Sequence, residues 1–157
     1  MSHASKPSFH GVIPPVVTPR TADGAVDTAS LEKLTKYLLD GGVTGLFILG
    51  SSGEVPYLTN DERDTVIRTV AGVNAGEVPV IAGACEQTTA RTIEEGRRLV
   101  GLGADAIVAT SQFYAISDMA ETDTHFRSLH AALDVPLFAY VVPVRTHYKL
   151  PLPLLVQ

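Results

Sequence analysis

The sequence predicts an α/β fold in which βα units add parallel strands to one sheet. Short apolar runs begin at residues 12, 45, 78, 106 and 136, so their starts are separated by 33, 33, 28 and 30 residues. Helical patterns occupy the intervals between the runs. The chain is 45% hydrophobic and only 18% charged, a composition typical of proteins whose parallel strands are buried on both faces of the sheet. Such an alternation of strand and helix is the pattern of βα units.

Five strands are expected, one from each apolar run. Each run is short and ends at a polar or glycine-containing segment, as buried parallel strands do. In chain order the runs read "VIPPVVTP" from residue 12, "GLFILG" from residue 45, "VPVIAG" from residue 78, "AIVAT" from residue 106 and "PLFAYVVP" from residue 136.

Four helices are expected between these strands. Asp27 is placed to cap the first helix, and Thr59 with Glu62 forms a capping box before the second. A further helix is expected to begin in "LPLPLLVQ", the last eight residues. The apolar stripes of the four helices consist of Leu31, Leu34 and Leu38; Val66, Val70 and Val73; Ile93, Leu99 and Val100; and Phe126, Leu129 and Leu133.

Two architectures fit this alternation, a doubly wound sheet and a (β/α)8 barrel. The nucleotide-binding form of the doubly wound sheet has G-x-G-x-x-G after its first strand, whereas this first run leads into "TPRTADG". A barrel needs eight units in about 250 residues, and this chain supplies five strands in 157 residues. As a barrel, residues 9–157 would form the N-terminal portion of a single domain, after a disordered arm at residues 1–8.

The composition excludes several classes of function. The net charge is −5, so no basic face for nucleic acid is expected. No apolar stretch reaches the roughly 20 residues that span a membrane, and no secretory signal is recognised at the start. Cys85 is the only cysteine, which excludes an internal disulfide and a multi-cysteine metal site. We therefore expect a cytoplasmic protein without a nucleic-acid or membrane partner.

Hydroxyl groups gather at the predicted carboxyl ends of the strands, where βα folds form their sites. The serines and amides of a glycine turn suit a carboxylate, tyrosines can transfer protons, and an arginine suits a second anion. Taken singly, these groups are a turn, packing aromatics and a surface charge, but their convergence on one rim favours a site. The strand-end groups are Thr18; Ser51 and Ser52 between Gly50 and Gly53; Thr110, Ser111 and Tyr114; and Tyr140 and Arg145.

The same rim offers little for metal or thiol chemistry. The clustered His, Asp and Glu ligands of a metal-dependent enzyme are not found at the strand ends, so no metal is expected there. His125 and His147 are expected to be solvated or to cap helices rather than to act in catalysis. Cys85 has no cationic neighbour in sequence and is expected to be an inert buried thiol.

Three motifs at the strand ends resemble those of one enzyme family. They are "GSSGE" after the second strand, "FY" after the fourth and "YVVPVRT" on the fifth, and they resemble the dihydrodipicolinate synthase / N-acetylneuraminate lyase family from "GVIPPVVTP" to "KLPLPLLV". The resemblance implies a (β/α)8 TIM barrel, here truncated after strand five. It also implies class I chemistry without a cofactor, in which a lysine forms a Schiff base with pyruvate, and a small aldehyde or 2-keto acid is the other partner. A homo-oligomer is implied for the full-length protein.

The resemblance implies a role for each residue at the rim. Ser51 would relay protons, and Ser52 with the turn of Gly50 and Gly53 would hold the pyruvate carboxylate. Tyr140 would act as general acid and base beside the Schiff base. The implied catalytic set is Tyr140, Ser51 and Tyr114, of which Tyr114 would reach into a neighbouring subunit's site. The implied substrate-binding set is Ser52, Gly50, Gly53, Thr18 and Arg145, of which Arg145 would bind the carboxylate of the aldehyde substrate.

Two features depart from the family's pattern. The segment Gln112-Phe113, Val141 and His147 differ from the family where the second substrate binds, so a 2-keto-3-deoxy sugar acid aldolase or an N-acetylneuraminate-type aldolase is an alternative. The nucleophilic lysine is expected roughly one βα unit past Tyr140, beyond the last residue. The chain is therefore predicted to be inactive alone, and a non-catalytic truncated half-barrel is the second alternative.

Overall fold

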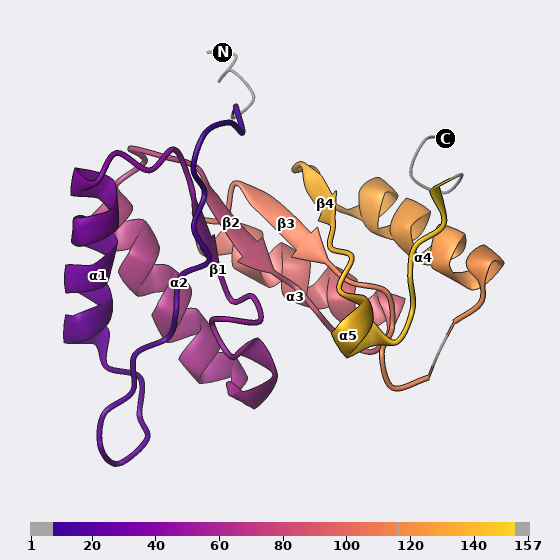
Figure 1. Ribbon diagram of the computed structural model, residues 1–157, viewed down its shortest axis with the longest axis horizontal. Helices are drawn as coiled ribbons and strands as arrows, with labels where there is room; N and C mark the ends of the chain where they lie inside the picture. Colours follow the sequence, from indigo (N-terminus) through magenta and orange to yellow (C-terminus); the bar gives the residue numbers. More distant parts are fainter. Residues whose placement is uncertain (1–7, 116, 153–157) are drawn as a thin grey trace.

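A single parallel sheet with helices on one face organises the chain (Figure 1). The computed structural model describes residues 8–115 and 117–152. Residues 1–7 of the expected arm, and residues 153–157 of the helix expected at the end of the chain, lie outside the described residues. In chain order the elements are α1 (Thr28–Asp40), β1 (Leu46–Ile48), the 3-10 turn η1 (Val55–Tyr57), α2 (Asn60–Asn74), β2 (Val80–Gly83), α3 (Thr89–Gly101), β3 (Ala106–Ala109), α4 (Met119–Ala132), β4 (Leu137–Ala139) and α5 (Pro143–Thr146).

The sheet contains four strands in the order β1-β2-β3-β4, and every neighbouring pair is parallel. Its register places Phe47 opposite Ile81, and Val108 opposite Phe138. Each strand therefore pairs with the strand that follows it in the chain, and a helix returns the chain between them. This is the βα alternation that the sequence predicts, with its carboxyl ends along one edge.

The first apolar run is not a strand in the described structure, so the prediction of five strands was wrong. Residues 12–19 lie beside β1, but they form only one isolated parallel bridge, between Pro15 and Phe47. The Val16 amide donates to the Phe47 carbonyl oxygen at 2.7 Å, and the Phe47 amide donates to the Pro14 carbonyl oxygen at 3.1 Å. Pro14 has no amide hydrogen to donate toward β1, so the ladder is interrupted on that side of the bridge.

The helix starts follow the local signals in the sequence. The Asp27 side chain accepts from the Ser30 amide at 3.0 Å, as an N-cap does. The Thr59 side chain accepts from the Glu62 amide, and the Glu62 carboxylate accepts in return from the Thr59 amide. Both predicted caps are therefore confirmed.

The two faces of the sheet carry different apolar clusters. The larger cluster joins strand residues such as Leu46 and Ile107 to the helix residues Ile67 and Leu99. The smaller cluster, on the other face, centres on Ile81, Ala106 and Val108, and the aromatic and aliphatic side chains packed against it come from no helix. The helices thus cover one face of the sheet. No helix within the described residues is long and apolar enough to cross a membrane.

Candidate active site

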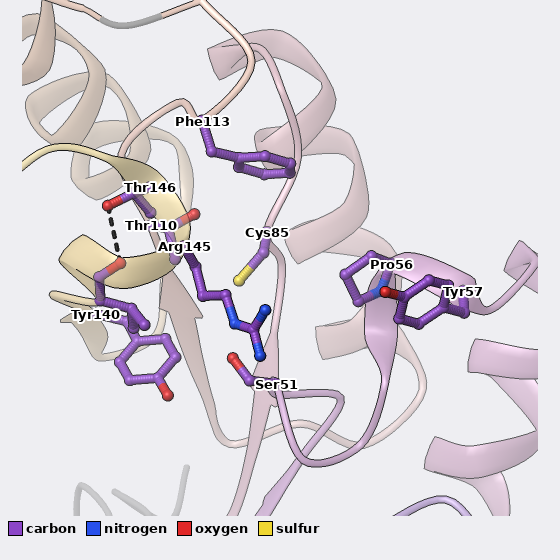
Figure 2. A pocket seen from close by; sticks show the side chains of 10 residues that line it. Ser51, Pro56, Tyr57, Cys85, Thr110, Phe113, Tyr140, Arg145 and Thr146 are labelled. Carbon is purple, nitrogen blue, oxygen red and sulfur yellow. Dashed lines mark hydrogen bonds between the residues drawn. The ribbon is translucent and has the colours of Figure 1, made fainter.

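A cavity of about 230 Å³ opens at the carboxyl ends of the strands (Figure 2). Its walls come from the loop after β1, the residues after β2 and β3, and the segment from the end of β4 into α5. The lining combines hydroxyl groups, one guanidinium group and apolar side chains, a composition that suits a small anionic ligand. The lining residues are Ser51, Pro56, Tyr57, Cys85, Thr110, Phe113, Tyr140, Val142, Arg145 and Thr146.

Ser51, Tyr140 and Arg145 meet at this cavity although they are far apart in the sequence. Figure 2 shows the Arg145 side chain extending from α5 toward Ser51. The Tyr140 amide donates to the Ala109 carbonyl oxygen at 2.8 Å, which continues the β3–β4 ladder by one residue. The Tyr140 ring packs edge-on against Phe47, with 5.9 Å between ring centroids. Strand pairing and ring packing together fix Tyr140 at the cavity.

The loop that carries Ser51 is a close turn of the backbone. The Glu54 amide donates to the Ser51 carbonyl oxygen at 3.2 Å, and Glu54 has a φ of 57°. A Cβ atom at Gly50 would lie 2.7 Å from the Phe47 ring, and one at Gly53 would lie 3.1 Å from the Leu49 nitrogen. The absence of a side chain at both positions therefore lets the turn close beneath the cavity.

Thr18 acts on this turn from outside the cavity. Its hydroxyl donates to the Gly53 carbonyl oxygen at 2.8 Å, and the residue is buried. Thr18 is not among the cavity-lining residues. In the described structure its contact is therefore with the loop, while its predicted contact with substrate stays a prediction.

Ser52 and Tyr114 lie outside the cavity lining. Ser52 is exposed, next to Ser51. Tyr114 has 91% of its surface exposed, and its amide donates to Gln87 Oε1 at 3.0 Å. The chain itself therefore does not bring Tyr114 into the site that Ser51, Tyr140 and Arg145 form.

His125 is buried, so the expectation of a solvated or capping histidine was wrong. Its exposed fraction is 1%. Nε2 lies 3.2 Å from the Thr110 carbonyl oxygen, and Nδ1 lies 2.9 Å from Thr89 Oγ1. Because a carbonyl oxygen only accepts, Nε2 carries the hydrogen and Nδ1 accepts from the threonine hydroxyl. Burial lowers the pKa of His125, against the effect of the Thr110 bond. His147 is exposed and ends α5.

Cys85 and Thr110 line the cavity, although neither of them was assigned a catalytic or binding role from the sequence. The Cys85 residue is partly exposed, whereas the surroundings of its thiol are buried, and this burial raises the pKa of the thiol to about 11 despite contacts with Thr110. The neutral thiol fits the expected inert cysteine. Thr110 Oγ1 is buried and makes no conventional hydrogen bond among the described residues. Their positions directly after β2 and β3 are the signal by which both could have been found.

The described lysines lie away from the cavity. Lys33 and Lys36 are exposed on α1, and Lys149 is exposed after α5. No described lysine lines the cavity. Among residues 8–115 and 117–152, no three His, Cys, Asp or Glu side chains are grouped so that they could hold a metal ion.

A site of hydroxyls and one arginine at the carboxyl ends of parallel strands defines this chain as an α/β protein of the βα-repeat class. The chain belongs to the Dihydrodipicolinate synthetase family, which matches residues 8–155.

Curated relatives and solved structures agree with this assignment. The chain is 39% identical over 144 residues to an uncharacterized DapA-like lyase of Halobacterium salinarum, covering 92% of this chain and 47% of that protein. It is 38% identical over 138 residues to 4-hydroxy-tetrahydrodipicolinate synthase of Exiguobacterium sibiricum, covering 88% of this chain and 47% of the enzyme. The chain thus spans about half the length of the curated relatives it matches.

A solved structure from Acinetobacter baumannii gives the same picture. It is a chloride-inhibited dihydrodipicolinate synthase complexed with pyruvate, and it superposes with a TM-score of 0.91 at 31% identity, covering 94% of this chain and 50% of that one. A putative dihydrodipicolinate synthetase from Pseudomonas aeruginosa superposes with a TM-score of 0.91 at 33% identity, covering 95% and 51% of the two chains. The fold is therefore that of the dihydrodipicolinate synthases over half their length.

Proposed function

We propose that this family member takes part in a class I lyase reaction on pyruvate. In that reaction a lysine amine attacks the ketone carbon of pyruvate, water leaves, and a Schiff base results. In the synthetic direction the Schiff base gives an enamine that adds to an aldehyde. In the cleavage direction the aldehyde is released and the enamine is formed. The observation that supports the proposal is the cavity that brings Ser51, Tyr140 and Arg145 together at the strand ends. A related synthase has been solved in complex with pyruvate.

The proposed roles follow from the chemistry of each group. Tyr140 protonates the hydroxyl group that leaves as water when the Schiff base forms, and it takes the proton that the methyl carbon of pyruvate loses when the enamine forms; Ser51 relays these protons along a hydrogen-bonded path. Ser52 and the amides of the glycine turn hold the pyruvate carboxylate. Arg145, whose planar guanidinium group matches a carboxylate, holds the anionic end of the aldehyde partner.

The proposal requires two groups that the described part of this chain does not bring to its own site. The first is the nucleophilic lysine, because no described lysine lines the cavity; we propose that this chain of 157 residues is inactive by itself. The second is a tyrosine from another subunit, since Tyr114 is 91% exposed and can complete a proton relay only in a neighbour's site. The proposed active state is therefore a homo-oligomer.

Borohydride trapping with pyruvate tests this function, because reduction converts a Schiff base to a stable amine. The 157-residue chain is expected to give no adduct by mass spectrometry. A chain extended to the length of the relatives is expected to gain one reduced pyruvate on a lysine. In that longer chain, Tyr140→Phe should slow adduct formation by roughly 10²-fold or more, whereas Tyr37→Phe, on the exposed face of α1, should not. An adduct on Lys149 of the short chain, or none on the long one, contradicts the proposal.

A further inference from the structure

Arg63 contacts two of the loops that carry cavity-lining residues, the loop after β1 and the loop after β2. It lies in the first turns of α2 and is 8% exposed. Its Nη2 donates to the Val55 carbonyl oxygen at 3.2 Å. Its Nη1 donates to Glu86 Oε1 at 2.6 Å and to Glu95 Oε1 at 3.2 Å. One guanidinium group therefore joins the loop after β1, the loop after β2 and helix α3.

The two attachment points adjoin the cavity walls. Val55 lies between Ser51 and Pro56 in the first loop, and both of these line the cavity. Glu86 directly follows Cys85, which lines it from the second loop. A change in the separation of the loops therefore changes the shape of the cavity.

The charges around Arg63 are balanced. Glu86 also pairs with Arg91 at 3.2 Å, and Glu95 pairs with Arg98 at 2.6 Å. Glu86 and Glu95 are 12% and 6% exposed, so each is a nearly buried carboxylate that depends on a cationic partner. This network alone would explain why Arg63 is present, without any role at the cavity.

Arg98 separates the two explanations. It shares Glu95 with Arg63 and also pairs with Asp64. Its remaining bond goes to the Asn60 carbonyl oxygen at 3.2 Å, and none of these partners lines the cavity. Arg98 is thus a member of the same charge network with no contact to either cavity loop.

We propose that Arg63 is a positioning residue that sets the spacing of residues 49–58 and 84–88, and thereby the shape of the cavity. Its planar fork holds a carbonyl oxygen with one nitrogen and a carboxylate with the other, whereas lysine carries its donors on a single nitrogen and lacks two donor atoms at fixed, separate positions. The meaning of this spacing for catalysis depends on the proposed function, but the spacing itself does not. The test therefore uses no pyruvate, and its failure is distinguishable from a failure of the lyase proposal.

The test compares Arg63→Lys with the matched control Arg98→Lys, since both keep the charge. Hydrogen exchange at residues 49–58 and 84–88 is expected to accelerate about tenfold or more in Arg63→Lys, because a charge-assisted bond to each loop is lost. At a fixed pH, the rate at which iodoacetamide alkylates Cys85 should rise by about the same factor, since the thiol becomes more accessible when the two loops loosen. Arg98→Lys should change these rates less than about twofold. Equal effects in both variants overturn the proposal.

The Glu86→Ala variant tests the proposal independently, and it can be used even if Arg63→Lys does not fold. This variant leaves Arg63 paired with Glu95 and bonded to Val55. Exchange is expected to accelerate at residues 84–88 and to stay unchanged at residues 49–58. Acceleration of both loops, or of neither, overturns the proposal, because either result means that the two loops are not held separately by Arg63.

Discussion

At Gly83 the backbone of β2 comes against the start of the Ser51 loop. A Cβ atom at this position would lie 2.1 Å from the Leu49 carbonyl oxygen and 2.9 Å from its carbon. Leu49 is fully buried and has a φ of 54°, a conformation that a branched residue adopts only where its surroundings impose it. The close approach of Gly83 and the turn at Leu49 together direct the chain out of β1 into the cavity loop.

Replacing Gly83 by alanine should therefore destabilise the fold, because backbone atoms cannot move aside as a flexible side chain does. The expected cost in the free energy of unfolding is about 1–3 kcal/mol, measured by urea denaturation. Gly72→Ala is the matched control, since nothing lies within 4 Å of a Cβ atom there, and it should stabilise helix α2 by about 0.5–1 kcal/mol. Equal effects of the two substitutions contradict this account.

The thiol of Cys85 gives a prediction on pH. Burial raises its pKa to about 11, from an ordinary value of 9.0, so the alkylation rate of the folded chain should keep rising up to about pH 11. In the unfolded chain the thiol ionises first, and the stability that the neutral folded thiol contributes is present below pH 9 and is lost as the pH rises toward 11. Iodoacetamide kinetics with and without urea measure both midpoints. The same midpoint in both states contradicts the burial of the thiol.

At the scale of the elements, His125 attaches α4 to the end of β3 and to the start of α3. Its ring is bonded to the Thr110 carbonyl oxygen and the Thr89 hydroxyl. Because burial lowers the pKa of His125 below 6.5, the folded state takes up a proton at a lower pH than the unfolded state does. The stability that the neutral ring contributes is thus present above pH 6.5 and is lost as the pH falls below it.

This sign predicts a stability loss on acidification that depends on one side chain. The free energy of unfolding should fall between about pH 7.5 and pH 5.0, and His125→Gln should make that decrease shallower because the variant has no proton to bind at this position. His147→Gln, at an exposed position, is the control and should leave the decrease unchanged. Urea denaturation at both pH values provides the measurement.

Elements with local signals could be predicted from the sequence, whereas elements that depend on distant partners could not. The caps at Asp27 and Thr59 depend on residues three positions away, and the structure confirms both. The first run is apolar enough for a strand, but Pro14 removes a donor that the ladder with β1 needs. In that run the missing amide hydrogen of proline opposed the apolar pattern, and no strand formed.

The site shows the same division. Strand ends are predictable from apolar runs, and Ser51, Tyr140 and Arg145, which follow three of these runs, line one cavity. The partners of Arg63 lie 23 and 32 residues further along the chain, and no spacing rule connects them. The burial of His125 likewise depends on how α4 packs, which its own sequence does not reveal.

At the scale of the whole molecule, the two faces of the sheet differ in how they are covered. Helices cover one face, and on the other Phe9, Ile13, Phe47 and Tyr140 pack around a small cluster. Phe138 on the edge strand β4 is 37% exposed, against Phe9. An apolar sheet face beside an open strand edge favours association with further chain.

The chain should therefore self-associate as its concentration rises, and Phe138→Lys should weaken this association by placing a charge on the edge strand. Sedimentation velocity over a concentration series provides the measurement. Tyr37→Lys is the control, because Tyr37 is 74% exposed on helix α1, away from the sheet. A native chain that remains monomeric at every concentration contradicts this prediction.

The strand order also bears on how the protein is made. Each described strand pairs with its successor in the chain, so the second member of every pair is the next one to leave the ribosome. Synthesis at about 5–20 residues per second would deliver successive βα units, of roughly 30 residues each, about two to six seconds apart. None of the described strands has to be inserted between two that are already paired, so this sheet can grow in the order of translation. A nascent chain halted after β3 should already protect the amides of β1 and β2.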